Sequence, residues 1–479
     1  MSIASTTRRG HSPLQAPPAQ HSPADGSPSR HLDRRHLRPV PGGAVQPAEL
    51  PAVVSADLGV PTLHRTVVDY ANLDHAASTP ALVSVKRAVD TALRTYSSVH
   101  RGNGYASRVT SRWYEDARQE VRRFVGARDG DHVVFTRNTT DSFNLLARAL
   151  PRDTEVIVFE AEHHATLLPW SKSRTTRLPV PGSLADARVL LTQALERSTA
   201  RHRLVVLCGA SNVTGELWPV RELAETARRH GARVALDAAQ LAPHRPIDVD
   251  ALGVDYVAFS GHKLYAPFGT GVLAGRGDWL DAAAPYLAGG GATAAVTERG
   301  TTWHGGAARH EAGSPNVIGA VALAAACAAL TEHREAVEAH ERALGHRLAE
   351  GLAEIDGVET YSLFGADHER VPVAAFTIDG IDSSLVSAVL SAEHGIGVRD
   401  GKFCAHLLVD ALLDDPYAAG PTTAVRVSLG LANTAEHVER FLGAVASLAA
   451  DGPAFGYEHG EDGWTPTSDP RDLSLPRPW

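Results

Sequence analysis

The chain has 479 residues, a hydrophobic content of 43% and a formal net charge of −9. This length is enough for two or three domains, and the mixed charge argues against a nucleic-acid-binding protein, which needs a basic surface. No segment approaches the roughly 20 apolar residues of a membrane span. The three cysteines, Cys208, Cys327 and Cys404, are far apart and suggest neither a disulfide framework nor a metal site, so we expect no metal and a reducing cytoplasm.

The first 50 residues are expected to be a disordered tail. Residues 1–40 are rich in proline and arginine, and prolines prevent a continuous amphipathic helix. The segment also has no apolar run of the kind that a secretory signal needs. We therefore assign residues 1–50 to a tail outside the folded domains.

Residues 84–320 are expected to form a large α/β domain. Short apolar runs alternate with helical patterns and predict strands at 133–135, 156–159, 204–207, 234–236 and 256–259. Such alternation is typical of a mostly parallel sheet with helices on both faces. Ligands of these sheets bind beyond the carboxyl ends of the strands.

The pattern changes after Pro315. Residues 317–355 are rich in alanine and leucine and predict one or two long helices, and strands are expected at 373–378, 397–399 and 425–429. We expect residues 66–83 and 321–448 to form a smaller α+β domain. Residues 451–479 are rich in proline, aspartate and glycine and are expected to be a loose C-terminal tail.

Two neighbouring predicted strands lead into residues with chemical potential. The strand at 234–236 runs into Asp237, and the strand at 256–259 leads to Lys263, so both side chains should lie at the carboxyl edge of the sheet. Pyridoxal phosphate (PLP) needs such a pair: a lysine that forms an imine, and a buried carboxylate that keeps the pyridine nitrogen protonated. From the spacing alone, a structural Asp–Lys ion pair is the simpler interpretation.

The residues around these positions resemble the class V aminotransferases, in particular the cysteine desulfurase and selenocysteine lyase family. The similarity spans about residues 68–446, and its motifs follow in the family's order. They are Leu73–Pro80, Val99–Gly102, Thr136–Asp141, Glu162–Ala165, Ser211–Gly215, Ser260–Pro267, Glu311–Asn316 and Arg426–Leu429. The resemblance implies the aspartate-aminotransferase-like fold of PLP-dependent transferases (fold type I), with PLP as the cofactor.

The resemblance also implies roles around the cofactor. Lys263 would hold PLP as a Schiff base and later act as the base, and Asp237 would pair with the ring nitrogen. Gln240 would bond the ring hydroxyl oxygen, and His163 would stack on the ring. Further cofactor-binding residues would be Thr139, Thr140, Ser260 and His262 at the phosphate, Asn212 near the ring, and Thr302, which would reach the phosphate across a homodimer interface.

The resemblance implies a substrate site as well. An amino-acid substrate carries a carboxylate, which arginine binds through two parallel hydrogen bonds. Arg426 would provide this clamp, with Arg399, His100 and Asn212 as further substrate-binding residues.

Residues 399–406 resemble the loop that carries the catalytic cysteine of desulfurases. In that reaction Cys404 would attack the sulfur of L-cysteine and become a persulfide, while alanine leaves. Lys402, Arg399 or His406 could lower the pKa of the Cys404 thiol. The loop departs from the family pattern, because Lys402 and Phe403 stand where the family has histidines. Cys404 could instead be a small buried residue.

The leading hypothesis is a PLP-dependent cysteine desulfurase that passes sulfur to an acceptor protein. The main alternative is a class V aminotransferase, or a C–S or C–Se lyase, that acts on another amino acid. A third hypothesis is a catalytically idle scaffold that binds PLP. A further departure from the family is His75, which stands where a small or amide residue is usual.

Overall fold

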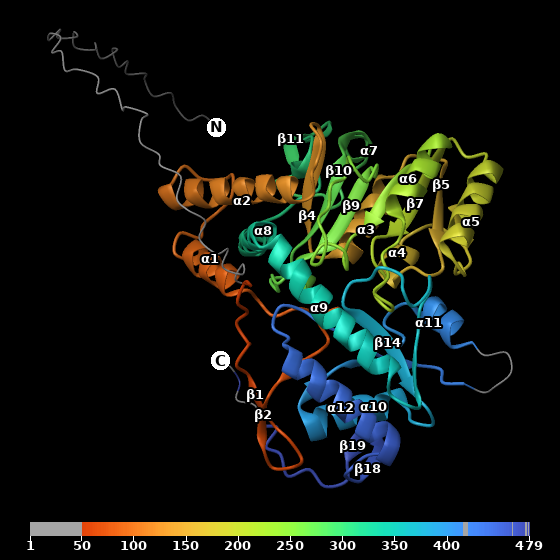
Figure 1. Ribbon diagram of the computed structural model, residues 1–479. Helices are drawn as coiled ribbons and strands as arrows, with labels where there is room; N and C mark the ends of the chain where they lie inside the picture. Colours follow the sequence, from red (N-terminus) through yellow and green to blue (C-terminus); the bar gives the residue numbers. More distant parts are fainter. Residues whose placement is uncertain (1–49, 415–419, 462, 475–476, 478) are drawn as a thin grey trace, which may run out of the picture. The chain divides into compact units, whose positions relative to one another are not determined.

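The computed structural model describes residues 50–414, 420–461, 463–474, 477 and 479 (Figure 1). The predicted N-terminal tail, residues 1–50, lies almost wholly outside the described residues. Pro47–Trp479 forms one compact unit, and the description below concerns this unit by itself.

A seven-stranded sheet forms the centre of the larger half. Its strands from β9 to β6 are parallel, whereas β10 runs antiparallel to both of its neighbours. The order across the sheet is β4 (Asp131–Thr136), β10 (Gly271–Arg276), β9 (Tyr256–Ser260), β8 (Arg233–Asp237), β7 (His202–Cys208), β5 (Thr154–Phe159) and β6 (Thr175–Leu178). The five predicted strands are all in this sheet, and the mostly parallel α/β fold is confirmed.

Helices cover both faces of this sheet. Successive residues of one strand, β7, therefore pack in different hydrophobic clusters. Val205 of β7 packs in a cluster with Leu223 of α6, and Val206 packs in another with Leu146 of α3. This burial on both faces explains why the central strands are apolar throughout rather than alternating. The helices of this half are α1 (Val83–Leu93), α2 (Tyr105–Phe124), α3 (Thr139–Ala149), α4 (His164–Leu167), α5 (Leu184–Arg197), α6 (Val220–Arg229), α7 (Gly277–Ala282) and α8 (Val317–Glu332).

The smaller half contains an antiparallel four-stranded sheet. Its order is β13 (Val358–Thr360), β14 (Val373–Ile378), β17 (Ala424–Ser428) and β16 (Arg399–Gly401). The helices that follow α8 are α9 (Arg334–Ala353), α10 (Ser383–His394), α11 (His406–Leu413) and α12 (Ala435–Asp451). The short strand β3 (Ala71–Asn72) pairs with β15 (Ile396–Gly397), which brings the segment before α1 to this half. The domain bounds given above stay a prediction.

The helical pattern at 317–355 corresponds to α8 and α9, which meet at a bend of 78°. In the part of the chain that the structure describes, no single helix is long and apolar enough to span a membrane, and only this bent pair passes the length and composition test together.

The segment after Asp451 is not the loose tail that its composition predicts. It forms a hairpin of β18 (Tyr457–Gly460) and β19 (Gly463–Pro466). Glu393 of α10 is buried and accepts hydrogen bonds from the Ala454 N–H at 3.2 Å and the Tyr457 hydroxyl at 3.1 Å. The anchor lies some 60 residues earlier in the chain, so composition alone could not reveal it. Two further hairpins are β1–β2 (Gly59–Pro61, Val67–Asp69) and β11–β12 (Thr293–Thr297, Gly300–Trp303).

Candidate active site

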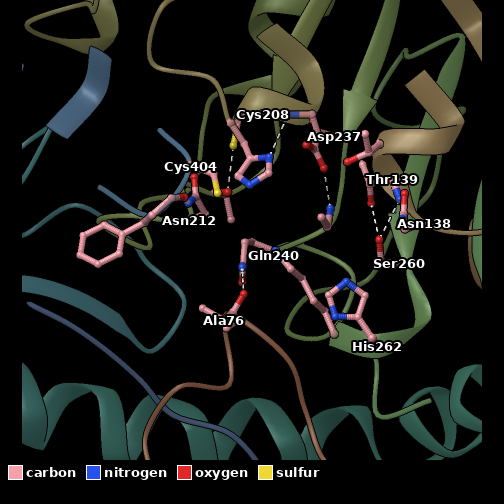
Figure 2. Close-up of a pocket in the computed structure, with 18 of the residues that line it drawn as sticks. Ala76, Asn138, Thr139, Cys208, Asn212, Asp237, Gln240, Ser260, His262 and Cys404 are labelled. Atoms are coloured by element: carbon pink, nitrogen blue, oxygen red, sulfur yellow. Dashed lines mark hydrogen bonds between the residues drawn. The ribbon is translucent and has the colours of Figure 1, made fainter. Parts of the chain in front are cut away.

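A cavity of about 190 Å³ lies beyond the carboxyl ends of the central strands (Figure 2). Both halves of the unit contribute to its wall. Among the predicted site residues, those that line it are Thr139, Thr140, His163, Asn212, Asp237, Gln240, Ser260, His262, Lys263, Arg399, Cys404 and Arg426. The structure therefore brings together residues separated by up to about 290 positions in the sequence.

Asp237 and Lys263 lie in the cavity wall as the strand pattern predicts. Asp237 ends β8, and its Oδ1 accepts a hydrogen bond from the Ala239 N–H at 2.8 Å. Burial raises the pKa of Asp237 to about 6, although the Ala239 N–H and Lys263 oppose this rise. Burial and the nearby Arg426 lower the pKa of Lys263 to about 8, with Asp237 opposing. A lysine with a lowered pKa keeps a substantial fraction of nucleophilic amine at neutral pH.

His163 and Gln240 are held by backbone groups. His163 caps α4, and its Nδ1 accepts a hydrogen bond from the Ala165 N–H at 3.0 Å, which leaves the ring proton on Nε2. Burial, followed by the charge of Lys263, lowers the pKa of His163 to about 3, so the ring is neutral. Gln240 donates one amide N–H to the Ala76 carbonyl at 2.7 Å, and its other N–H and its carbonyl have no partner among the described residues.

The N-terminus of α3 forms one end of the cavity. Asn138 caps the helix and accepts from the Asp141 N–H. Ser260 Oγ accepts from the Thr139 N–H at 2.8 Å and lies 2.7 Å from Thr139 Oγ1. Hydroxyl groups gathered at a helix N-terminus are suited to an anion such as a phosphate.

Arg426 is a buried guanidinium, 2% exposed, in the cavity wall. Its Nη2 donates to Asp74 Oδ1 at 2.8 Å and its Nη1 to the Asn212 carbonyl at 3.0 Å. Its Nε has no hydrogen-bond partner within the described ranges. Arg399 lies directly opposite Arg426 in the β16–β17 pairing. A buried N–H without a partner is costly, so this pair of arginines fits a carboxylate ligand.

The Cys404 loop is held in an unusual backbone conformation. Phe403 and Cys404 have φ angles of 51° and 56°, the left-handed region that few non-glycine residues adopt. The Asn212 side chain donates to the Phe403 carbonyl, and the His164 N–H donates to the Cys404 carbonyl, both at 2.8 Å. These bonds fix the loop so that Cys404 faces the cavity (Figure 2).

Cys404 is exposed, so the alternative of a small buried residue is wrong. Lys402 forms an ion pair with Asp410, and its charge is therefore partly neutralised near the thiol. The His406 ring contacts the His164 ring at a centroid distance of 4.6 Å. Arg426 lies near enough to Cys404 for their charges to interact.

Two predicted site residues lie outside this cavity. His100 is exposed and pairs with Glu115 of α2 at 3.1 Å. Thr302 is exposed on the β11–β12 hairpin, where its hydroxyl donates to the Ala295 carbonyl. Neither residue lines the cavity.

Sequence reasoning missed three residues around the cavity. Cys208 ends β7 and lines the cavity beside Asp237. Asp74 bonds Arg426, and Glu162 is buried directly before His163 in the chain. Cys208 could have been found from its position, because it ends a strand next to the one that delivers Asp237.

The family model described as "Aminotransferase class-V" matches residues 71–441. The chain is 35% identical to a probable cysteine desulfurase of Vibrio cholerae, over 78% of this chain and 92% of that protein. It is also 35% identical to a cysteine desulfurase of Haloferax volcanii, over 82% of this chain and 92% of that protein.

Solved structures give a similar result. The apo structure of cysteine desulfurase from Thermococcus onnurineus NA1 has a TM-score of 0.72 and 31% identity, covering 79% of this chain and 94% of that one. The cysteine desulfurase CsdA from Escherichia coli has a TM-score of 0.68 and 32% identity, covering 78% and 94%. The likeness therefore extends over nearly the full length of these proteins.

Proposed function

The chain belongs to the class-V aminotransferase family, and we propose that it is a PLP-dependent cysteine desulfurase. It converts L-cysteine to L-alanine and transfers the sulfur to Cys404 as a persulfide. The observation that carries this proposal is the exposed Cys404 thiol at a cavity that Lys263 and Arg426 also line.

The residues of the cavity fit PLP. Asp237 has one oxygen engaged by the Ala239 N–H, so the other suits the ring nitrogen, and Lys263 suits attachment of the cofactor. Bound there, PLP would supply an electron sink for negative charge at the substrate Cα. The remaining residues proposed to hold it are His163, Gln240, Asn212, Thr139, Thr140, Ser260 and His262.

The substrate would be oriented by its carboxylate. Arg426 offers a buried, unpartnered Nε–H among the described residues, and Arg399 lies beside it. With the carboxylate held there, the Lys263 amine would take the proton from Cα, which its lowered pKa permits at neutral pH.

Sulfur transfer would then use Cys404 as a thiolate. Its sulfur attacks the substrate sulfur, an S–S bond forms and the substrate Cβ–S bond breaks. Cβ takes a proton, so one cysteine and one thiol give one alanine and one persulfide. No external oxidant is required.

This proposal is tested by incubating the full-length protein with PLP, L-cysteine and a reducing thiol, and measuring sulfide and alanine together. We expect equal amounts from the wild type and almost none from Cys404→Ala. Cys327→Ala, which removes a buried thiol in α8, is the matched control and should retain both products. Sulfide production that survives Cys404→Ala would refute the role of Cys404.

A second candidate is an aminotransferase, or a C–S or C–Se lyase, with another substrate. It is favoured by two loop residues that stand where the family has histidines. Lys402 is paired with Asp410, and Phe403 is buried with its ring 5.2 Å from the Arg426 guanidinium. An activity of this kind would persist in Cys404→Ala, whereas Lys263→Ala would abolish it.

We also propose a homodimer and a protein sulfur acceptor. Thr302 lies on an exposed hairpin outside its own cavity, as a residue that serves the partner's site would. The exposed Cys404 is accessible to an acceptor thiol. Three free cysteines are compatible with a reducing compartment such as the cytoplasm.

A further inference from the structure

Glu162 is a buried carboxyl group to which the mechanism above gives no role. It directly precedes His163, between β5 and α4, and is 1% exposed. Its Oε1 accepts the Cys208 N–H at 2.7 Å, at the end of β7. Its Oε2 lies 3.1 Å from Thr166 Oγ1, in α4. The carboxyl group therefore connects the central sheet to the turn that carries His163.

The hydrogen bonds of Thr166 allow two protonation states of Glu162. Thr166 Oγ1 lies 2.8 Å from the His163 carbonyl oxygen and 3.1 Å from Glu162 Oε2. A hydroxyl group has one proton to donate, and a backbone carbonyl can only accept. In one arrangement the Thr166 hydroxyl donates to Glu162 Oε2, as it would to an ionised carboxylate. In the other it donates to the closer His163 carbonyl and accepts a proton from a neutral Glu162.

The surroundings of Glu162 favour the neutral form. Cys208 and Asp237 are register partners on neighbouring strands (Figure 2), so a second buried carboxyl group lies close by. Burial, followed by the charge of Asp237, raises the pKa of Glu162 to about 8, although the bonds from Cys208 and Thr166 oppose this rise. Lys263 acts on Asp237, the adjacent His163 is neutral, and no cation of the described residues is among the groups that act on Glu162.

We propose that Glu162 is a positioning residue that stays protonated at neutral pH. It fixes the backbone of His163 through Thr166, and it leaves Asp237 as the carboxyl group that ionises beneath the cofactor. The proposal rests on the proposed function only for the roles of His163 and Asp237, because the burial of Glu162 beside a second carboxyl group and its bonds to Cys208 and Thr166 do not depend on the reaction.

The matched variants are Glu162→Gln and Glu162→Ala. A glutamine can donate N–H to Thr166 and accept from Cys208, so it reproduces the protonated acid, whereas alanine leaves both groups without a partner. We expect the infrared difference spectrum of wild type minus Glu162→Gln at pH 7 to contain the carbonyl stretch of a protonated carboxylic acid. Carboxylate bands at pH 7 in its place would overturn the proposal.

The melting temperature gives an independent check of the same proton. Since the folded pKa is raised above the ordinary 4.5, the unfolded chain releases a proton that the folded protein keeps between pH 4.5 and about 8. The wild type should therefore lose stability relative to Glu162→Gln as pH rises through this window, by roughly 5 °C in Tm. A constant difference would contradict a protonated Glu162.

The positioning role is tested by PLP affinity, which needs no substrate turnover. We expect the PLP dissociation constant of Glu162→Gln to stay within about 3-fold of the wild type, and that of Glu162→Ala to rise by about 10-fold or more, since lost buried hydrogen bonds cost about 1–3 kcal/mol. Equal affinities for glutamine and alanine would reject positioning. The infrared spectrum, the melting temperature and the PLP affinity can all be interpreted even if the protein has no desulfurase activity.

Discussion

His75 allows a quantitative prediction about acid stability. Its imidazole is 3% exposed, and neither ring nitrogen has a hydrogen-bond partner in the described part of the chain. The packing is tight, because a Cβ added at Gly430 would lie 2.0 Å from His75 Nδ1. Burial, with a further contribution from His244, lowers the pKa of His75 from 6.5 to about 4. The folded protein therefore excludes the proton that the unfolded chain takes up below pH 6.5.

The sign and size of the effect follow from this shift. The stability associated with the neutral ring is present above pH 6.5 and is lost as pH falls towards 4. Proton linkage gives a loss of about 2 kcal/mol between pH 7 and pH 5. His75→Leu removes this dependence, and it also removes two unsatisfied polar atoms, which cost about 1–3 kcal/mol each in a buried site.

The assay is urea denaturation of the wild type and His75→Leu at pH 7 and pH 5. The free energy of unfolding of the wild type should fall, relative to the variant, by about 2 kcal/mol at the lower pH. His304→Leu, at an exposed position, is the control and should not reproduce this change. If the difference between wild type and His75→Leu is the same at both pH values, His75 has a partner and the reasoning is refuted.

Three other predictions concern the cavity and the C-terminal hairpin. Lys263→Ala should lose the visible absorbance of bound PLP and all turnover, and retained turnover would show that another group acts as the base. Arg426→Lys should raise KM for the amino acid on the order of 100-fold, because one ammonium cannot replace the bidentate guanidinium and its bond to Asp74. An unchanged KM in steady-state kinetics would show that the substrate carboxylate binds elsewhere. Glu393→Ala should destabilise the protein by about 2–4 kcal/mol and expose residues after Asp451 to protease, because the hairpin loses its buried hydrogen-bond acceptor. Unchanged proteolysis would show that other contacts hold the hairpin.

Local sequence patterns were sufficient to predict the central sheet and the two main groups at its edge. Apolar runs of strand length are a local property, and burial on both faces of a parallel sheet makes them continuous, as in β9, where all five residues are buried. Asp237 and Lys263 follow such strands directly, so chain order alone brings them to one edge. The roles of Gln240 and His163 came instead from the family resemblance.

The tertiary structure decided what depends on contacts between distant residues. Asp74 and Arg426 are 352 positions apart, and neither has a local pattern that predicts their ion pair. Glu393 turns a segment of loop-like composition into a docked hairpin, and Asn212 and His164 hold Cys404 open to the cavity. Hydrogen bonds of this kind depend on distances that only the packed fold determines, whereas the pattern of apolar residues is already present in the sequence.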